Sequence, residues 1–267
     1  MKDIQSISNS SVKHVTRLRQ SKYRKQYKQF LVDDWQCIKY FDSWANNQLN
    51  NYQPVIIYFC RQHLSDKLSK WLTTPKKYCH EIINVNDAVI QKMSCRENTS
   101  GIVICCPQPE KKCDLPATPC VILDGVEKPG NIGAVMRTCV AMGVKGLILH
   151  NCSTDLWNHN ICRASAGSCF MIAAYTMTTR ELKQWVSKQN VELISADAND
   201  DNSVVDLTMT TDMAFVFGSE NKGVSQEMIE LSSKSAIIPM CPGVDSLNVS
   251  TALAMIVYEM SRQGILK

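Results

Sequence analysis

Ile238 to Ser250 reads Ile-Pro-Met-Cys-Pro-Gly-Val-Asp-Ser-Leu-Asn-Val-Ser. Its apolar start predicts a short strand over 236–239, and two prolines and a glycine break the chain after that strand. A helix is expected next, because apolar residues recur at helical spacing. These residues are Val249, Ala252, Leu253, Ile256, Val257 and Met260. The stretch is therefore a strand–loop–helix passage, with Ser246 and Asn248 where a helix takes its capping residue.

Two earlier stretches have the same form. Asn131-Ile-Gly-Ala-Val-Met-Arg137 follows an expected strand at 120–124, and Phe217-Gly-Ser-Glu-Asn-Lys-Gly223 follows one at 214–217. Further strands are expected at 146–149, 170–173 and 191–194, with helical patterns between most of them. This alternation predicts a parallel sheet with both faces covered. Sites in such sheets lie at the carboxyl ends of the strands, and all three stretches fall at such ends.

In this order and spacing, the three stretches resemble the signature motifs of the SPOUT methyltransferases. The SpoU/TrmH branch, which methylates the ribose 2′-OH of RNA with S-adenosyl-L-methionine, is the best match. The resemblance implies an α/β fold in which residues 120–267 form a methyltransferase domain with a mostly parallel sheet and a trefoil knot. It also implies a homodimer that needs no metal. Knots are very rare, so that expectation depends on the resemblance alone.

The resemblance implies roles for individual residues. Those expected to be catalytic are Asn131, Arg137, Glu220, Ser246 and Asn248. Those expected at the cofactor are Phe217, Gly218, Ser219, Gly223, Ile238, Met240 and Leu247. Taken singly, each catalytic candidate has a plainer interpretation as a helix cap, a surface residue or part of a polar turn. A guanidinium stays protonated and is a poor base, so we expect Arg137 to hold a phosphate and stabilise the developing alkoxide.

Arg163-Ala-Ser-Ala-Gly-Ser168 resembles another segment of the family, which lies near the substrate RNA. The plainer interpretation is a tight turn from a helix into the strand expected at 170–173. We expect no catalytic role for Arg163.

The N-terminal part alternates helix and strand patterns, which predicts a small α/β domain over residues 1–106. Strands are expected at 30–32, 55–59 and 101–105, and helices around 12–18, 35–41, 64–72 and 85–93. The domain resembles the L30e-like RNA-binding domain that precedes many SpoU-type enzymes. Family members often have Glu-Gly after the first of these strands, where this chain has Asp33-Asp34. A proline-rich linker is expected over 107–119.

A basic stretch near the N-terminus contains no acidic residue. Its charged residues are Lys13, Arg17, Arg19, Lys22, Arg24, Lys25 and Lys28. Such a stretch neutralises phosphates, and the interleaved Tyr23 and Tyr27 could stack on unpaired bases. A solvated helix face is the alternative.

Composition limits the alternatives. The net charge of the 267-residue chain is only +4, so an RNA partner is inferred from the basic stretch and not from the total charge. The thirteen cysteines include no CxxC pair, which favours buried thiols in a reducing cytoplasm over disulfides or zinc. No apolar run is long enough to span a membrane, and the N-terminus lacks the apolar core of a secretory signal.

Motifs of other enzyme classes are missing. The chain has no G-x-G-x-x-G after the strand at 120–124, no phosphate-binding G-x-x-x-x-G-K-[ST] and no H-E-x-x-H. The sequence therefore predicts an RNA 2′-O-ribose methyltransferase, with ribosomal RNA as the favoured substrate. A tRNA ribose methyltransferase and a non-catalytic RNA-binding protein on the same scaffold are the alternatives.

Overall fold

The computed structural model describes residues 2–49, 54–109, 115–197, 202–243 and 245–266. Part of the predicted linker, residues 110–114, lies outside this range, as does Val244 of the third motif. The chain forms two compact units. Unit 1 is Met1–Lys112 with Trp157–Phe170, and unit 2 is Cys113–Leu156 with Met171–Lys267. The main division falls within the predicted linker, but segment 157–170 packs with the N-terminal residues.

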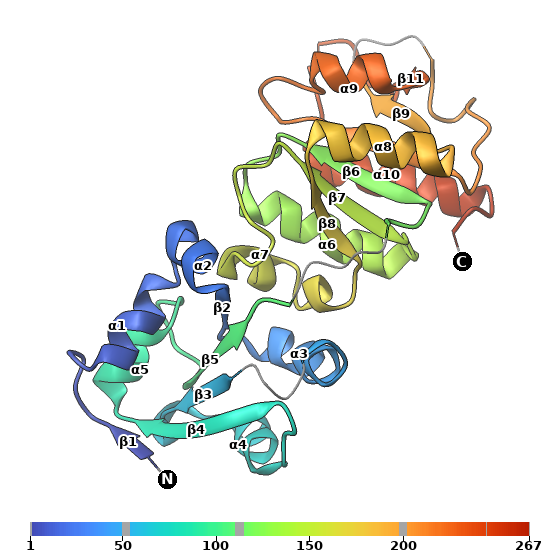
Figure 1. Cartoon of the computed structure of the whole chain (residues 1–267). Helices are drawn as coiled ribbons and strands as arrows, with labels where there is room; N and C mark the ends of the chain where they lie inside the picture. The colour runs from blue at the N-terminus through green and yellow to red at the C-terminus, as the bar shows by residue number, and fades with distance from the viewer. Residues whose placement is uncertain (1, 50–53, 110–114, 198–201, 244, 267) are drawn as a thin grey trace. The chain divides into compact units, whose positions relative to one another are not determined.

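Unit 1 contains a five-stranded mixed sheet in the order β1-β4-β3-β5-β2 (Figure 1). The strands are β1 Lys2–Ile4, β2 Gln29–Val32, β3 Val55–Phe59, β4 Cys79–Val85 and β5 Ile102–Pro107. Strands β1, β4 and β3 are parallel, whereas β5 is antiparallel to both β3 and β2. The sequence predicts β2, β3 and β5 because their runs are apolar. It misses β1, and it misses β4 because charged and polar residues interrupt that strand.

Most helices of unit 1 begin at a side chain that caps them, although α2 has no side-chain cap. The helices are α1 Ser10–Arg17, α2 Ser21–Tyr27, α3 Trp35–Gln48, α4 Asp66–Thr73 and α5 Asp87–Met93, with a short 3-10 helix at Arg61–His63. Side-chain oxygens of Asn9, Asp34, Ser65 and Asn86 accept hydrogen bonds from the first-turn amides of α1, α3, α4 and α5. Apolar faces of α1 and α5 then share one core with β2 to β5.

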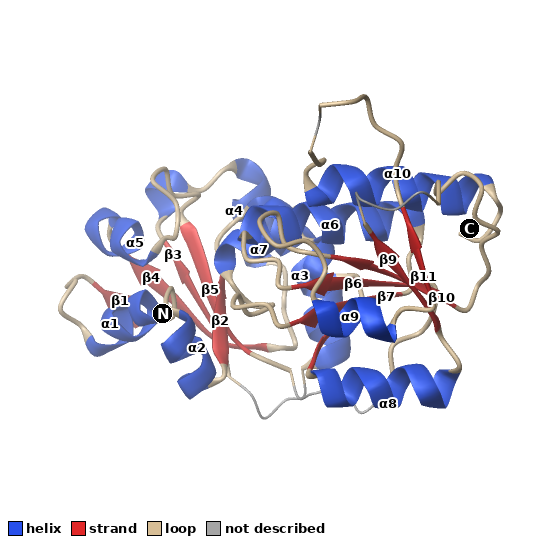
Figure 2. Cartoon of the chain, turned by 90° about the horizontal axis from the view of Figure 1, so that it is seen from above, coloured by secondary structure: helices blue, strands red, loops and turns tan. Residues whose placement is uncertain are grey.

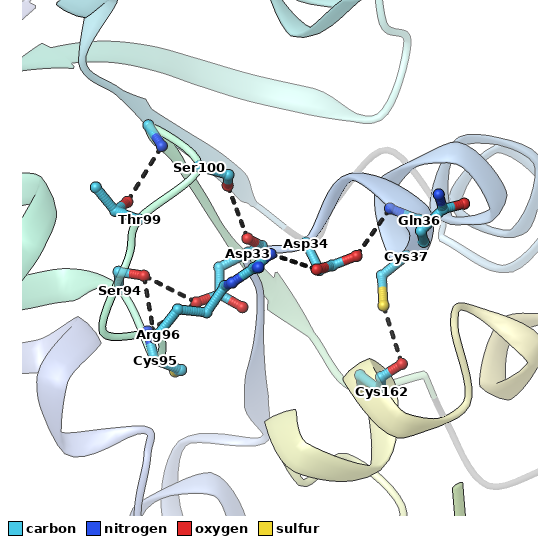
Figure 3. Close-up of polar contacts among 11 residues, drawn as sticks. Asp33, Asp34, Gln36, Cys37, Ser94, Cys95, Arg96, Thr99, Ser100 and Cys162 are labelled. Atoms are coloured by element: carbon cyan, nitrogen blue, oxygen red, sulfur yellow. Dashed lines mark hydrogen bonds and ion pairs between the residues drawn. The ribbon is translucent and has the colours of Figure 1, made fainter. Parts of the chain in front are cut away.

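The Asp33–Asp34 turn connects β2 to the loop before β5 (Figure 3). Asp33 Oδ2 accepts hydrogen bonds from Ser94 Oγ at 3.1 Å and from Cys95 N at 2.7 Å. Asp34 caps α3 and forms an ion pair with Arg96. Burial raises the pKa of Asp33 above its usual value. The two aspartates thus fix this turn through side chains, where family members often carry Glu-Gly.

Segment 157–170 completes an aromatic cluster of unit 1. It contains α7 His159–Ala164 and a 3-10 turn at Ser168–Phe170. The Trp157 ring lies 4.5 Å from that of Phe30, and the Phe170 ring lies 5.3 Å from that of Trp44, between centroids. Cys37 Sγ also donates a hydrogen bond to Cys162 O at 2.9 Å (Figure 3). The strand expected at 170–173 is therefore wrong, because contacts with distant residues hold its first part in a turn.

Unit 2 contains a six-stranded sheet in the order β11-β9-β10-β6-β7-β8, and every pairing in it is parallel. The strands are β6 Cys120–Asp124, β7 Gly146–His150, β8 Ala174–Met177, β9 Glu192–Ala196, β10 Met213–Phe217 and β11 Lys234–Ala236. Strands β6, β7 and β10 are buried along their whole length, as a parallel sheet covered on both faces requires. The predicted fold class is confirmed; the trefoil knot stays a prediction.

Helices cover both faces of this sheet (Figure 2). They are α6 Pro129–Met142, α8 Thr179–Gln189, α9 Gln226–Leu231 and α10 Val249–Arg262. The view in Figure 2 shows α6 and α10 on one face and α8 and α9 on the other. Leu182 and Trp185 of α8 and Met228 of α9 enter one core with the strands. No helix among the described residues is both long and apolar enough to cross a membrane.

Candidate active site

The first motif occupies the start of α6, directly after β6. The helix begins at Pro129, which suits a first helical position because it has no amide hydrogen to leave unpaired, and ends at Gly143 in the left-handed conformation. Asn131 is therefore within the first turn and is not the capping residue. Its side chain is free to bond across the sheet edge.

The second motif is a tight turn after β10. Ser219 and Gly223 exchange backbone hydrogen bonds of 3.0 and 2.9 Å, and Gly223 has φ +65°. A Cβ on Gly218 would lie 1.9 Å from the Gly223 carbonyl carbon, so only glycine fits there. The turn presents Glu220 beside Asn131.

The third motif contains Asn248, the capping residue of α10. Its Oδ1 accepts hydrogen bonds from Ser250 N at 3.0 Å and Ser250 Oγ at 2.7 Å. Its Nδ2 donates to Asn131 Oδ1 at 3.3 Å. The capping interpretation of Asn248 is thus correct, but it describes only half of this side chain.

A chain of hydrogen bonds joins the three motifs. Asn248 donates to Asn131, and Asn131 Nδ2 donates to Glu220 Oε1. Lys128 Nζ lies 3.6 Å from the same carboxylate oxygen. Residues 117 positions apart therefore meet at the carboxyl ends of the strands. We call Glu220, Asn131 and Asn248 the polar triad.

A pocket of about 310 Å³ opens beside the polar triad. Glu220 and Ser246 both line it, as do all seven residues predicted at the cofactor. The wall also contains residues that were not predicted there: Ala196, Asp197, Lys222, Val224, Ile229, Ala236, Ile237, Val249 and Ala252. Position at the end of β9 could have indicated Ala196 and Asp197, because its neighbour β10 carries a motif at the same edge. The remaining wall residues carry no local signal.

Arg137 lies apart from this pocket. It is exposed on α6, six residues beyond Asn131, which is about 9 Å along a helix axis. It is not among the residues that line the pocket, and no hydrogen bond or ion pair links its side chain to another described residue. Among the described residues of this single chain, the structure brings four of the five catalytic candidates together and leaves Arg137 at the surface.

The basic stretch divides into two groups. Arg24 is 2% exposed and donates hydrogen bonds to Leu18 O at 2.9 Å and Arg19 O at 2.7 Å. Arg19 donates to the Lys92 carbonyl at 2.6 Å and to that of Ser94. Burial of Arg24 speaks against the predicted RNA contact, because its donors are used to close the turn between α1 and α2. The exposed members are Lys13, Arg17, Lys22, Lys25 and Lys28.

Aromatic rings accompany the exposed members of the basic stretch. Tyr23 and Tyr27 stack with ring centroids 6.1 Å apart, and Arg17 Cζ lies 5.6 Å from the Tyr23 centroid. These are the side-chain types that contact RNA bases and phosphates.

The described cysteines are free thiols, and most of them are buried. Burial raises the pKa of Cys139, in α6, to about 12. Buried thiols of this kind act as small apolar side chains, as the composition suggests. Cys241, in the third motif, is exposed.

Residues 118–258 match the model of the SpoU rRNA Methylase family, and residues 9–104 match an MRM3-like substrate binding domain. The chain belongs to the SpoU rRNA methylase family. The first match covers more than half of the sequence and contains all three motifs, so the resemblance read from those motifs is confirmed.

One relative matches nearly the whole chain, and another matches about half of it. An uncharacterized tRNA/rRNA methyltransferase of Synechocystis sp. is 27% identical over 97% of this chain and 93% of its own. The 23S rRNA (adenosine(1067)-2′-O)-methyltransferase of Streptomyces azureus is 37% identical, but that match spans about half of each chain, 52% in both cases.

The solved structure of the SpoU methyltransferase AviRb from Streptomyces viridochromogenes, in complex with AdoMet, superposes with a TM-score of 0.84. Sequence identity is 25% over 96% of this chain and 98% of that one. The likeness extends over both units.

Proposed function

We propose that this chain transfers a methyl group from S-adenosyl-L-methionine (AdoMet) to a ribose 2′-OH of ribosomal RNA. The observation that carries the proposal is the polar triad, which brings one side chain from each motif to the rim of a single pocket. A non-catalytic RNA-binding protein could bind RNA with the surface of this fold alone. It would have no need for three polar residues that bond to one another at the edge of the sheet.

The pocket suits AdoMet in size and lining. Its volume lies at the lower end of the range for small-molecule sites. Apolar side chains of Ile238, Met240 and Leu247 would hold the adenosine part, and the missing side chain at Gly218 leaves backbone exposed to the ligand. Bound AdoMet supplies a methyl group on a positively charged sulfur.

Residues of this chain would position the ribose hydroxyl so that its oxygen attacks the methyl group. Ser246 and the polar triad offer donors and acceptors beside the pocket. Arg137 would bind an RNA phosphate and stabilise the alkoxide as it forms, because fixed positive charge at the developing oxyanion lowers the barrier. Orientation of the two reactants contributes much of the remaining acceleration.

We also propose a homodimer in which the Arg137 surface adjoins the partner's pocket. Support comes from the position of Arg137 outside the pocket and from α10, which packs on α6 and exposes the large apolar side chains of Met255 and Tyr258. These two side chains are three positions apart on one helix and share a face, and an exposed apolar patch of this kind supports an interface. We place the protein in the cytoplasm, where its free thiols would stay reduced.

Unit 1 would bind the substrate RNA through the exposed members of the basic stretch. Its match to a substrate binding domain and the stacked tyrosines support this role. Ribosomal RNA is favoured over tRNA because the Streptomyces azureus relative acts on 23S rRNA.

Methyl transfer from labelled AdoMet to unmodified ribosomal RNA and unmodified tRNA, followed by mapping of 2′-O-methyl positions, tests the proposal. One labelled ribose in ribosomal RNA is expected. Label found only in tRNA would mean that tRNA, and not ribosomal RNA, is the substrate. Absence of both transfer and AdoMet binding would favour the non-catalytic RNA-binding protein.

A further inference from the structure

A chain of polar side chains begins at two buried residues near the carboxyl ends of β6 and β7, reaches the exposed Glu227, and plays no part in the polar triad. Asp124, at the end of β6, is 3% exposed, and His150, at the end of β7, is fully buried. His150 Nδ1 lies 2.8 Å from Asp124 Oδ1, and Nε2 lies 3.0 Å from Thr179 Oγ1 at the start of α8. Thr179 Oγ1 donates to Glu227 Oε2 in α9 at 3.1 Å. We call these four residues the relay.

The relay holds the wall of the pocket at two points. Asp124 Oδ2 accepts a hydrogen bond from Ser225 N at 2.7 Å, immediately after the second motif. Glu227 contacts Thr179 from the first turn of α9. Val224 and Ile229, which flank these two anchors, line the pocket. The relay therefore fixes the segment that runs from Gly218 to Ile229 against β6, β7 and α8.

The anchors act together with apolar packing, because Val224 and Met228 join the core of unit 2. Helix α9 has only six residues, and Ile229 is 38% exposed. Between the turn at Ser219–Gly223 and the buried Met228, the Asp124 carboxylate is the described side chain that bonds to the backbone of the segment. Burial by itself would raise the pKa of Asp124, but hydrogen bonds from His150 and Ser225 bring it below its usual value, so the carboxylate stays charged.

We propose that Asp124, His150 and Thr179 are positioning residues that preorganise the pocket wall for AdoMet. The inference rests on the proposed function, because it concerns the cofactor of that site. In a variant whose pocket wall is loosened, AdoMet must order the segment when it binds. The free energy that this ordering costs weakens AdoMet binding. Chemistry on the bound complex depends on the polar triad and on Arg137, which the relay does not touch.

Two variants with matched controls test the proposal. His150→Asn removes the central side chain of the relay, and Thr179→Val removes a hydroxyl at nearly constant shape on a half-buried position. Thr179→Ser keeps the hydroxyl and serves as its control. Cys120→Ala, at the opposite end of β6, controls for loss of packing in the same core.

Calorimetry with AdoMet and with S-adenosylhomocysteine gives the affinity directly. We expect His150→Asn to weaken both by about tenfold and Thr179→Val by a few-fold. Thr179→Ser and Cys120→Ala should stay near wild type. In the ligand-free variants, amide hydrogen exchange should accelerate over residues 218–229. With saturating AdoMet, kcat should stay near wild type while KM for AdoMet rises.

Unchanged AdoMet affinity in folded His150→Asn would overturn the inference. If His150→Asn does not fold, equal affinities of Thr179→Val and Thr179→Ser would overturn it. A wild-type protein that fails to bind AdoMet would overturn the proposed function and this inference together, whereas a wild type that binds beside unaffected variants overturns the inference alone.

Discussion

The edge of the unit 2 sheet and the basic stretch of unit 1 differ in whether the side chains predicted to act together contact one another. At the sheet edge, Asn131, Glu220 and Asn248 come from distant segments and bond to each other. In the basic stretch, Arg19 and Arg24 turn inward and bond to backbone carbonyls. Four of the five catalytic candidates chosen by motif order met at one site, with Arg137 as the exception, whereas residues chosen by charge alone divided between structural and exposed positions.

The largest effect should come from substitution of Arg137, which lies outside the polar triad. We expect Arg137→Ala to lower kcat/KM for RNA by about 10²–10³, because it removes the fixed charge at the developing alkoxide. Steady-state methyl transfer measures this. Arg180→Ala, another exposed arginine of unit 2, is the control. Loss of folding or of AdoMet binding in Arg137→Ala would remove the catalytic assignment.

Gly218 tests whether the second motif builds the pocket. A methyl group there collides with the Gly223 backbone, so Gly218→Ala should displace the turn and weaken AdoMet binding by about tenfold or more. Gly130→Ala is the matched control, because a Cβ at that position has nothing within 4 Å. Equal affinities of the two variants would contradict the role of the turn.

Charge reversal tests the exposed members of the basic stretch in unit 1. Lys22→Glu, Lys25→Glu and Lys28→Glu together should weaken RNA binding severalfold and reduce the salt slope of log K by about 0.7 for each RNA phosphate that is no longer neutralised. Arg180→Glu, Lys183→Glu and Lys188→Glu on α8 form the control set. An unaltered salt slope in the first set would remove the RNA role from the exposed basic residues.

The smallest effect is a pH dependence set by Asp124. Its pKa is lowered in the folded protein, so its stabilisation is complete above the unfolded value of about 3.9 and is lost as the pH falls through the folded value. Chemical unfolding at pH 7 and pH 3 should show Asp124→Asn destabilised mainly at pH 7. An equal deficit at both pH values would mean that the carboxylate charge contributes nothing.

Much of the unit 2 sheet follows from the sequence, because buried parallel strands are nearly continuous apolar runs such as Val121 to Leu123. The strand expected at 170–173 failed since Trp157 and Phe170 pack with Phe30 and Trp44, which are more than a hundred residues away. Strand β4 was missed because polar residues interrupt its apolar pattern. Long-range packing decided each of these elements.

Within the candidate site, motif order predicted which residues meet but not how. Asn248 caps α10 and also bonds to Asn131, a combination that local sequence cannot show. Asp124 and His150 carry no shared motif and meet only because β6 and β7 pair in register. Burial of Arg24 was unpredictable for the same reason, since its acceptors are backbone carbonyls placed by the fold.

The central claim is that the three motifs form one catalytic site, and a double-mutant cycle on Asn131 and Glu220 tests it most directly. The account predicts that Asn131→Ala and Glu220→Ala each lower kcat/KM for methyl transfer, and that the double variant is little worse than the poorer single variant. Effects that multiply fully in the double variant would show that the two residues act independently and would contradict the account.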